Sequence, residues 1–149
     1  MLIDTNVLVY AYDRSEPDKQ RRALDVLDRL VNTGEGRLSA QVLSEFYVSV
    51  TAKIPSPLTK AEAEGRLAHY VQLWPVYPVS ATVVLEAVRG VNDYQFSFWD
   101  AQIWAAARLN HIPVVLSENF NSGAVIEGVR FVDPFQQDFE LAALGGNDE

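Results

Sequence analysis

The sequence contains no cysteine, which excludes disulfide bonds, thiolate metal sites and a cysteine nucleophile. Histidine is scarce, and the two that occur, His69 and His111, stand apart from each other and are expected to be structural rather than catalytic. The chain also lacks a Gly-x-Ser-x-Gly elbow, a phosphate-binding P-loop and a Gly-x-Gly-x-x-Gly turn. The sequence therefore lacks the residues that cysteine-dependent enzymes, serine hydrolases, P-loop enzymes and dinucleotide-binding enzymes require.

Long hydrophobic runs are absent as well. No apolar stretch approaches the roughly 20 residues needed to cross a bilayer, and no basic segment followed by an apolar one opens the chain. We therefore expect a cytoplasmic protein without a membrane partner.

Basic residues are outnumbered, with 12 Lys and Arg against 20 Asp and Glu and a net charge of −8. This balance argues against a general nucleic-acid-binding surface, which is normally basic. It is compatible with an enzyme whose acidic cluster binds a divalent cation, because the metal then supplies the positive charge that meets a phosphate. A local basic patch at Arg21 and Arg22 is interpreted as a solvated helix face, with contact to RNA as the alternative.

With 149 residues and 48% apolar residues, the chain is expected to form one domain with a sizeable core. Short apolar segments alternate with segments of helical periodicity, which predicts an α/β fold with a central parallel sheet covered on both faces. Strands are expected at 2–3, 37–39, 76–77, 113–116 and 129–132, helices at 17–33, 40–52, 59–74, 81–92 and 97–110, and a loop at 120–128. The last five residues, 145–149, are expected to be disordered.

The first strand ends at Asp4, which Thr5 and Asn6 follow before another apolar segment. In an open parallel sheet, ligands bind just beyond the carboxyl ends of the strands, so Asp4 lies where chemistry is expected. The structural alternative is that Asp4 only caps the following helix.

Three further positions carry acids or amides in comparable places. Glu45 lies at the edge of an apolar helix face, at four-residue spacing from Gln41 and Ser49, although a surface glutamate is the simpler interpretation. Asp100 follows Ser97 by three residues, which is also the spacing of a capping box. Glu118 and Asn119 end the penultimate strand.

Together, these residues would form an oxygen-rich pocket at one edge of the sheet. Oxygen ligands suit Mg²⁺ or Mn²⁺, and clustered carboxylates repel one another unless a cation is bound. Because alternate residues of a strand share a face, Asn119 is expected to point to the same side as Ser117 and Asp4, and Glu118 away from it.

At this point, the chain resembles PIN-domain ribonucleases of the kind found as VapC-type toxins in bacterial toxin–antitoxin systems. The resemblance covers residues 2–134 and rests on four motifs in this order: Leu2-Ile3-Asp4-Thr5-Asn6, then 38–47 (LSAQVLSEFY), Phe98-Trp99-Asp100-Ala101 and 115–120 (VLSENF). It implies a PIN domain at 1–134 with a C-terminal tail at 135–149, and a PIN-like α/β/α sandwich.

The resemblance also implies metal-dependent cleavage of RNA. By motif position, Asp4 and Asp100 correspond to the main ligands of Mg²⁺ or Mn²⁺ and Glu45 to the third acid. Asn119 stands where the family often carries a fourth aspartate, which is the clearest departure from its pattern. Hydrogen bonds that hold the ligand carboxylates are expected from Thr5, Asn6 and Ser117.

The resemblance implies an RNA substrate and a cognate antitoxin protein. The amphipathic helices at 59–92, with the aromatic residues Phe96, Phe98 and Trp99, predict a homodimer and a site for a partner peptide, a plain core being the alternative for the aromatics. Two other functions remain open: a non-catalytic PIN module that binds RNA or protein, and an RNA-processing PIN nuclease without an antitoxin.

Overall fold

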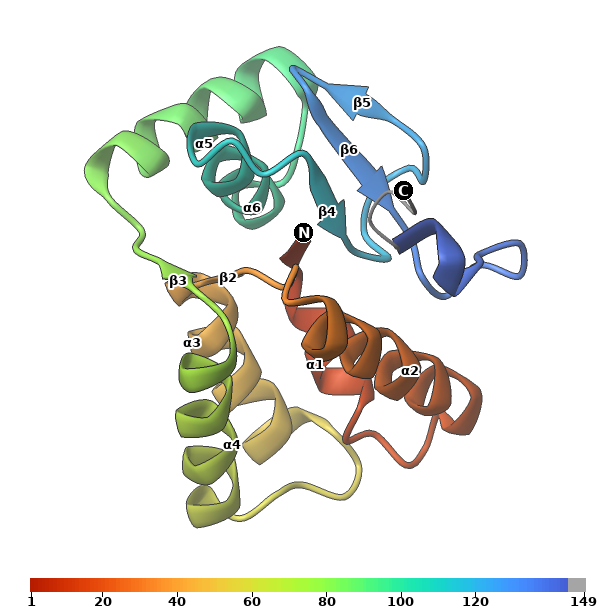
Figure 1. Ribbon diagram of the computed structural model, residues 1–149. Coiled ribbons are helices and arrows are strands. Elements are labelled where there is room, and N and C mark those ends of the chain that lie inside the picture. The colour runs from red at the N-terminus through yellow and green to blue at the C-terminus, as the bar shows by residue number, and fades with distance from the viewer. Residues whose placement is uncertain (145–149) are drawn as a thin grey trace.

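Pairs of helices separate the first four strands, and the computed structural model describes residues 1–144 (Figure 1). The elements are β1 (Leu2–Ile3), α1 (Thr5–Tyr10), α2 (Pro17–Thr33), β2 (Leu38–Ser39), α3 (Ala40–Val48), a π-helical turn (Ser49–Lys53), α4 (Lys60–Leu73), β3 (Val76–Tyr77), α5 (Ala81–Tyr94), α6 (Phe98–Leu109), β4 (Val114–Leu116), β5 (Val125–Ile126), β6 (Val129–Val132) and a 3₁₀ turn (Leu141–Leu144). The disorder expected at 145–149 lies outside the described residues.

The main sheet has the strand order β1-β4-β6-β5. Strands β1, β4 and β6 are parallel, with Leu2 opposite Val115 and Val115 opposite Phe131. Helices α5 and α6 lie on one side of this sheet and α1 and α2 on the other (Figure 1). The predicted α/β sandwich with a mainly parallel sheet is therefore confirmed.

The prediction of a loop at 120–128 is wrong in part, because this segment contains β5, which pairs antiparallel with β6. Glu127 and Gly128 join the two strands with positive φ angles of 49° and 83°. Two such residues form the tight turn that matches the twist of a hairpin. Glutamate rarely takes this conformation, so the sequence gives little sign of the turn.

The second strand, β2, lies outside the four-stranded main sheet. It pairs in parallel with β3 as a separate two-stranded sheet, with Leu38 opposite Val76. A single bridge between Leu2 and Arg37 connects this small sheet to β1.

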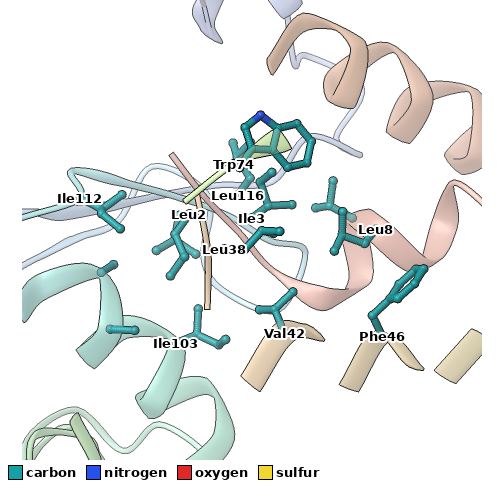
Figure 2. Close-up of a cluster of buried hydrophobic side chains, with 14 of the residues drawn as sticks. Leu2, Ile3, Leu8, Leu38, Val42, Phe46, Trp74, Ile103, Ile112 and Leu116 are labelled. Carbon is teal, nitrogen blue, oxygen red and sulfur yellow. The ribbon is translucent and has the colours of Figure 1, made fainter. Parts of the chain in front are cut away.

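The core forms around β1, whose Leu2 and Ile3 are completely buried. Figure 2 shows side chains from α1, α3, α6 and β4 gathered around this strand, among them Leu8, Phe46 and Ile103. Helix α5 approaches α6 closely at Gly90, where an added Cβ would lie 2.8 Å from Trp104 Cζ3. The buried strand fixes the position of Asp4, the residue that follows it.

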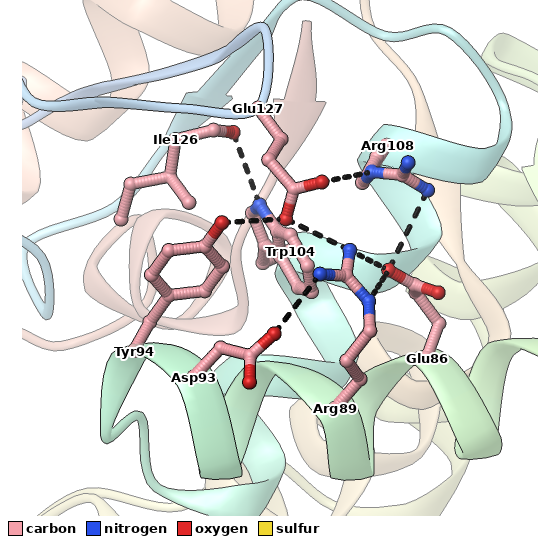
Figure 3. Close-up of polar contacts among 8 residues, drawn as sticks. All are labelled: Glu86, Arg89, Asp93, Tyr94, Trp104, Arg108, Ile126 and Glu127. Carbon is pink, nitrogen blue, oxygen red and sulfur yellow. Dashed lines mark hydrogen bonds and ion pairs between the residues drawn. The ribbon is translucent and has the colours of Figure 1, made fainter.

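A network of charged side chains ties the β5–β6 hairpin to α5 and α6 (Figure 3). Arg89 pairs with Glu86, Asp93 and Glu127, and Arg108 pairs with Glu86 and Glu127. These contacts hold the far edge of the sheet against the helix pair.

The segment after β6 packs against α2. Arg22 Nη1 donates hydrogen bonds to the carbonyl oxygens of Pro134 and Phe139 at 3.2 and 3.1 Å, and Leu144 is buried. The domain boundary at residue 134 stays a prediction. Over residues 1–144, no helix combines the length and the apolar character required to span a bilayer.

Candidate active site

A pocket of about 330 Å³, hereafter the carboxylate pocket, opens beside the carboxyl ends of β1 and β4. Its walls come from α1, α3, α6 and the segment after β4. The lining residues are Asp4, Thr5, Asn6, Val9, Tyr10, Asp13, Gln41, Glu45, Ser49, Trp99, Asp100, Ile103 and Asn119. The structure thus brings together the four residues expected to carry the chemistry, Asp4, Glu45, Asp100 and Asn119.

Asp4 both caps α1 and lines the pocket, so the two interpretations of this residue are compatible. Its Oδ1 accepts a hydrogen bond from the Thr5 N–H at 2.7 Å, and its Oδ2 accepts one from Ser117 Oγ at 2.6 Å. Asn6 Nδ2 lies 3.5 Å from the same Oδ2 and 3.3 Å from Ser117 Oγ. The three residues expected to support the ligands therefore surround Asp4, Thr5 through its backbone.

The environment of Asp4 disfavours its charged form. Burial raises the pKa of the Asp4 carboxyl to about 6, and the nearby charges of Asp100 and Glu45 raise it further. The hydrogen bonds from Ser117 and Thr5 act in the opposite direction but do not offset burial. A cation bound beside Asp4 would relieve both the desolvation and the repulsion.

Glu45 reaches the pocket because α3 turns one face toward it. Gln41, Glu45 and Ser49, at four-residue spacing, all line the carboxylate pocket. Gln41 is buried, and its Nε2 donates to Glu45 Oε1 at 2.7 Å and to the Trp99 carbonyl oxygen at 3.1 Å. Gln102 Nε2 in turn donates to Gln41 Oε1 at 2.7 Å. Two buried amides thus link Glu45 on α3 to the helix that carries Asp100.

Asp100 stands in the first turn of α6, and its backbone N–H donates to Ser97 Oγ at 3.3 Å. The cap that the sequence predicts is therefore formed by the serine side chain. Asp100 also lines the pocket. It therefore belongs both to the helix cap and to the group of acids in the pocket.

The two residues that follow Ser117 at the end of β4 have different surroundings. Asn119 lines the carboxylate pocket, whereas Glu118 accepts hydrogen bonds from Tyr10 OH at 2.6 Å and from Lys19 Nζ at 3.0 Å. The Asn119 N–H donates to Ser117 Oγ at 3.0 Å. Glu118 therefore fastens the strand end to α1 and α2.

Sequence reasoning missed one acid. Asp13 lines the same pocket, and its Oδ1 accepts hydrogen bonds from the Ser15 N–H and Oγ. Asn6, Tyr10 and Asp13 follow one another at steps of four and three residues, the spacing of one helix face. This spacing was the available signal, although α1 itself ends at Tyr10.

The donor set fits a hard cation. Four carboxylates line the pocket, and no lysine or arginine of residues 1–144 lines it with them. The Thr5 hydroxyl, which belongs to the same wall, is buried without a hydrogen-bond partner within the described part of the chain. No three acids or histidines in that part stand close enough together to form a metal site as they are. The fit to a cation therefore rests on the chemistry of the lining groups and not on their spacing.

The remaining candidates lie elsewhere. His69 and His111 are exposed and do not line the pocket. Phe96 packs against Trp104, Phe120 and Phe131 as part of the core, which is the simpler interpretation of that aromatic residue.

Several solved structures share the fold of this chain at low sequence identity. No curated protein matches the chain. Among solved structures, a toxin–antitoxin complex from Klebsiella pneumoniae aligns with a TM-score of 0.63 at 22% identity, covering 89% of this chain and 96% of that one. VapC20 of Mycobacterium tuberculosis, described as a toxin that cleaves the sarcin–ricin loop, aligns with a TM-score of 0.59 at 18% identity, covering 87% and 98%.

VapBC2 from Rickettsia felis, bound to a DNA fragment of its promoter, aligns with a TM-score of 0.61 at 16% identity, covering 87% of this chain and 95% of that one. At such identities, the likeness establishes a shared fold. The PIN domain model matches residues 1–121, most of the 149-residue chain, and confirms the family predicted from the motifs. The protein therefore belongs to the PIN domain family.

Proposed function

We propose that this PIN domain is a divalent-metal-dependent endoribonuclease that hydrolyses phosphodiester bonds of single-stranded RNA. The observation that carries the proposal is the carboxylate pocket, where Asp4, Glu45 and Asp100 face one cavity with no basic residue of the described chain in its lining. Such a pocket repels a phosphate unless a cation binds between them. The overall charge of −8 is consistent with this, since the metal provides the attraction locally.

Asp4, Asp100 and Glu45 are the residues that would hold Mg²⁺ or Mn²⁺. When bound, the cation neutralises charge on the scissile phosphate and lowers the pKa of a coordinated water toward neutrality. Ser117, Asn6 and the Thr5 N–H fix the orientation of Asp4.

Glu45 is the residue assigned to proton transfer. Gln41 holds its Oε1, which orients the carboxylate toward an attacking water. As the water oxygen bonds to phosphorus, Glu45 would accept the water proton; the bond to the leaving ribose oxygen breaks, and that oxygen keeps the electron pair and takes a proton from solvent. Asn119 adds a neutral oxygen and an N–H₂ donor at the rim of the pocket.

The proposal includes a biological role as the toxin of a toxin–antitoxin pair. It is supported by the likeness to a toxin–antitoxin complex and to VapBC2. The antitoxin would insert a lysine or arginine among the carboxylates and cover the apolar rim beside them. A gene for a small DNA-binding protein next to this one would favour the toxin role over RNA processing without an antitoxin.

The test is incubation of purified protein with a panel of RNAs in Mg²⁺, in Mn²⁺ and in EDTA. We expect cleavage with either metal and none in EDTA. Asp4→Asn and Asp100→Asn should abolish cleavage without unfolding the protein. Asp25→Asn serves as the matched control, because Asp25 is exposed and does not line the carboxylate pocket.

Cleavage at the wild-type rate by both pocket variants would contradict the assignment. RNA binding without cleavage under every metal condition would instead favour the non-catalytic module.

A further inference from the structure

Trp99 is exposed although it is the largest apolar side chain near the carboxylates. Its exposed fraction is 62%, whereas Trp74 and Trp104 are 3% and 0% exposed. The ring is supported from one side by Phe98, in an edge-to-face contact with centroids 5.0 Å apart. Its carbonyl oxygen accepts the hydrogen bond from Gln41. An indole held in this way is available to a ligand rather than to the core.

A second cavity of about 620 Å³, hereafter the side cavity, adjoins the carboxylate pocket. The two have Gln41, Glu45, Ser49 and Trp99 in common among their lining residues, so they lie side by side. The other residues of the side cavity combine apolar, amide, hydroxyl and basic groups: Ala40, Ser44, Val48, Lys53, Val79 and Gln102.

The composition of the side cavity suits a nucleotide. An aromatic plane and aliphatic side chains can contact the faces of a base, while the hydroxyls of Ser44 and Ser49 can reach its polar edge. Lys53 is the one basic residue that lines either cavity within the described chain, and its charge can neutralise a phosphate bound nearby.

If a phosphodiester occupies the carboxylate pocket, as the proposed function requires, the adjoining nucleotide falls into the side cavity. We infer that Trp99 is a stacking platform for the base next to the scissile phosphate of single-stranded RNA. Base–aromatic stacking is tolerant of sequence and requires an unpaired base, so the site selects single strands over duplexes. Trp99 is thereby a specificity-determining residue rather than a catalytic one.

The inference is tested by tryptophan fluorescence, because Trp99 is the exposed tryptophan of the three. The titration uses the wild-type protein in Mg²⁺ on ice and is read before any cleavage can be detected, because the bound cation is needed to hold the phosphate. A short oligouridylate should quench the emission and protect it from acrylamide. The same titration of Trp99→Phe should show neither change.

Affinity provides the second measurement. Trp99→Ala should weaken oligouridylate binding about tenfold, the loss expected for one stacked base, and Trp99→Phe should retain binding within about threefold. An abasic oligomer of equal length should bind Trp99→Ala and the parent equally. Leu24→Ala is the matched control, because Leu24 is 51% exposed and lines neither cavity.

In the active enzyme, Trp99→Ala should raise KM about tenfold with little change in kcat. Three results would each overturn the stacking site: unchanged RNA affinity of Trp99→Ala, a loss of affinity in Trp99→Phe as large as that in Trp99→Ala, or no RNA binding by the wild type. Quenching by RNA in a protein that never cleaves would overturn the nuclease and leave the stacking site in place. Cleavage with the same KM and kcat in Trp99→Ala as in the wild type would overturn the stacking site and leave the nuclease in place.

Discussion

The side-chain amide of Gln41 donates a hydrogen bond to Glu45 Oε1 at 2.7 Å, one turn along the same helix. Gln41 is buried, and the carbonyl oxygen of Trp99 and the amide of Gln102 satisfy the rest of its side chain. The orientation of the Glu45 carboxylate therefore depends on groups that lie on α6. This contact joins the two helices that supply acids to the pocket.

Gln41→Met, which retains the volume but removes the donor, should lower kcat about tenfold with a small change in KM. The reason is that Glu45 loses the group that orients it while substrate contacts remain. Gln72→Met is the control, because Gln72 is exposed on α4. Since Gln41 is buried, circular dichroism melts have to show that the variant is folded under the assay conditions. An unchanged kcat in a folded Gln41→Met protein would remove this role.

Asp4→Asn should stabilise the metal-free protein at neutral and alkaline pH. The pKa of Asp4 is about 6 in the folded chain against an ordinary value of 3.8, so the folded state binds the proton more tightly than the unfolded state. Stability therefore falls as pH rises from about 4 to 6, by at most about 3 kcal/mol, and stays reduced above that range. Thermal melts in EDTA should show a higher Tm for Asp4→Asn at pH 8 and a shrinking difference toward pH 4.

The same variant should lose the stabilisation that Mg²⁺ gives to the wild type, because binding to the folded state is what raises Tm. Asp25→Asn should follow the wild type in both buffers. An equal or lower Tm for Asp4→Asn at pH 8 in EDTA would show that burial of the Asp4 charge is not destabilising.

Local sequence rules accounted for much of the fold. Ser39, Ser80 and Ser97 cap their helices, and Thr59 forms the full capping box with Glu62. These features could be predicted because each depends on residues within one helical turn. The ends of β1 and β4 could likewise be predicted, because buried apolar runs stop at Asp4 and Ser117.

Features that depend on distant contacts could not be predicted in this way. In α2, Leu24 and Val31 belong to a plausible apolar stripe, yet they are 51% and 43% exposed, and Val26 is buried instead. The separate pairing of β2 with β3 is set by contacts between segments far apart in the chain. The link from Gln102 to Gln41 crosses 61 residues, so no local pattern predicts it.

A homodimer is expected to form through α4 and α5. Exposed apolar side chains occur on both helices: Val71 on α4 is 53% exposed, and Val84, Leu85 and Val88 on α5 are 36%, 72% and 44% exposed. Burial of such residues against a second copy would remove them from water. Leu85→Arg should give a monomer by light scattering at concentrations where the wild type is a dimer, whereas Leu24→Arg on α2 should leave the dimer intact. A wild type that is monomeric at high concentration would contradict the expectation.

Mutation of Asn119 should change cleavage and Mg²⁺ binding, whereas mutation of Glu118 should not. The reason is that Asn119 lines the carboxylate pocket, while Glu118 is held by Tyr10 and Lys19. Asn119→Asp should tighten Mg²⁺ binding, since a carboxylate is a stronger ligand for a hard cation than an amide. Asn119→Ala should slow cleavage about 10–100-fold, less than the loss expected from Asp4→Asn. Glu118→Gln should leave the cleavage rate and Mg²⁺ affinity unchanged and lower Tm slightly, because a neutral amide weakens the pairing with Lys19. Calorimetric titration measures the Mg²⁺ affinity of each variant, and initial rates measure its cleavage. An inactive but folded Glu118→Gln protein beside a fully active Asn119→Ala protein would reverse the assignment and make Glu118 the residue that works at this end of β4.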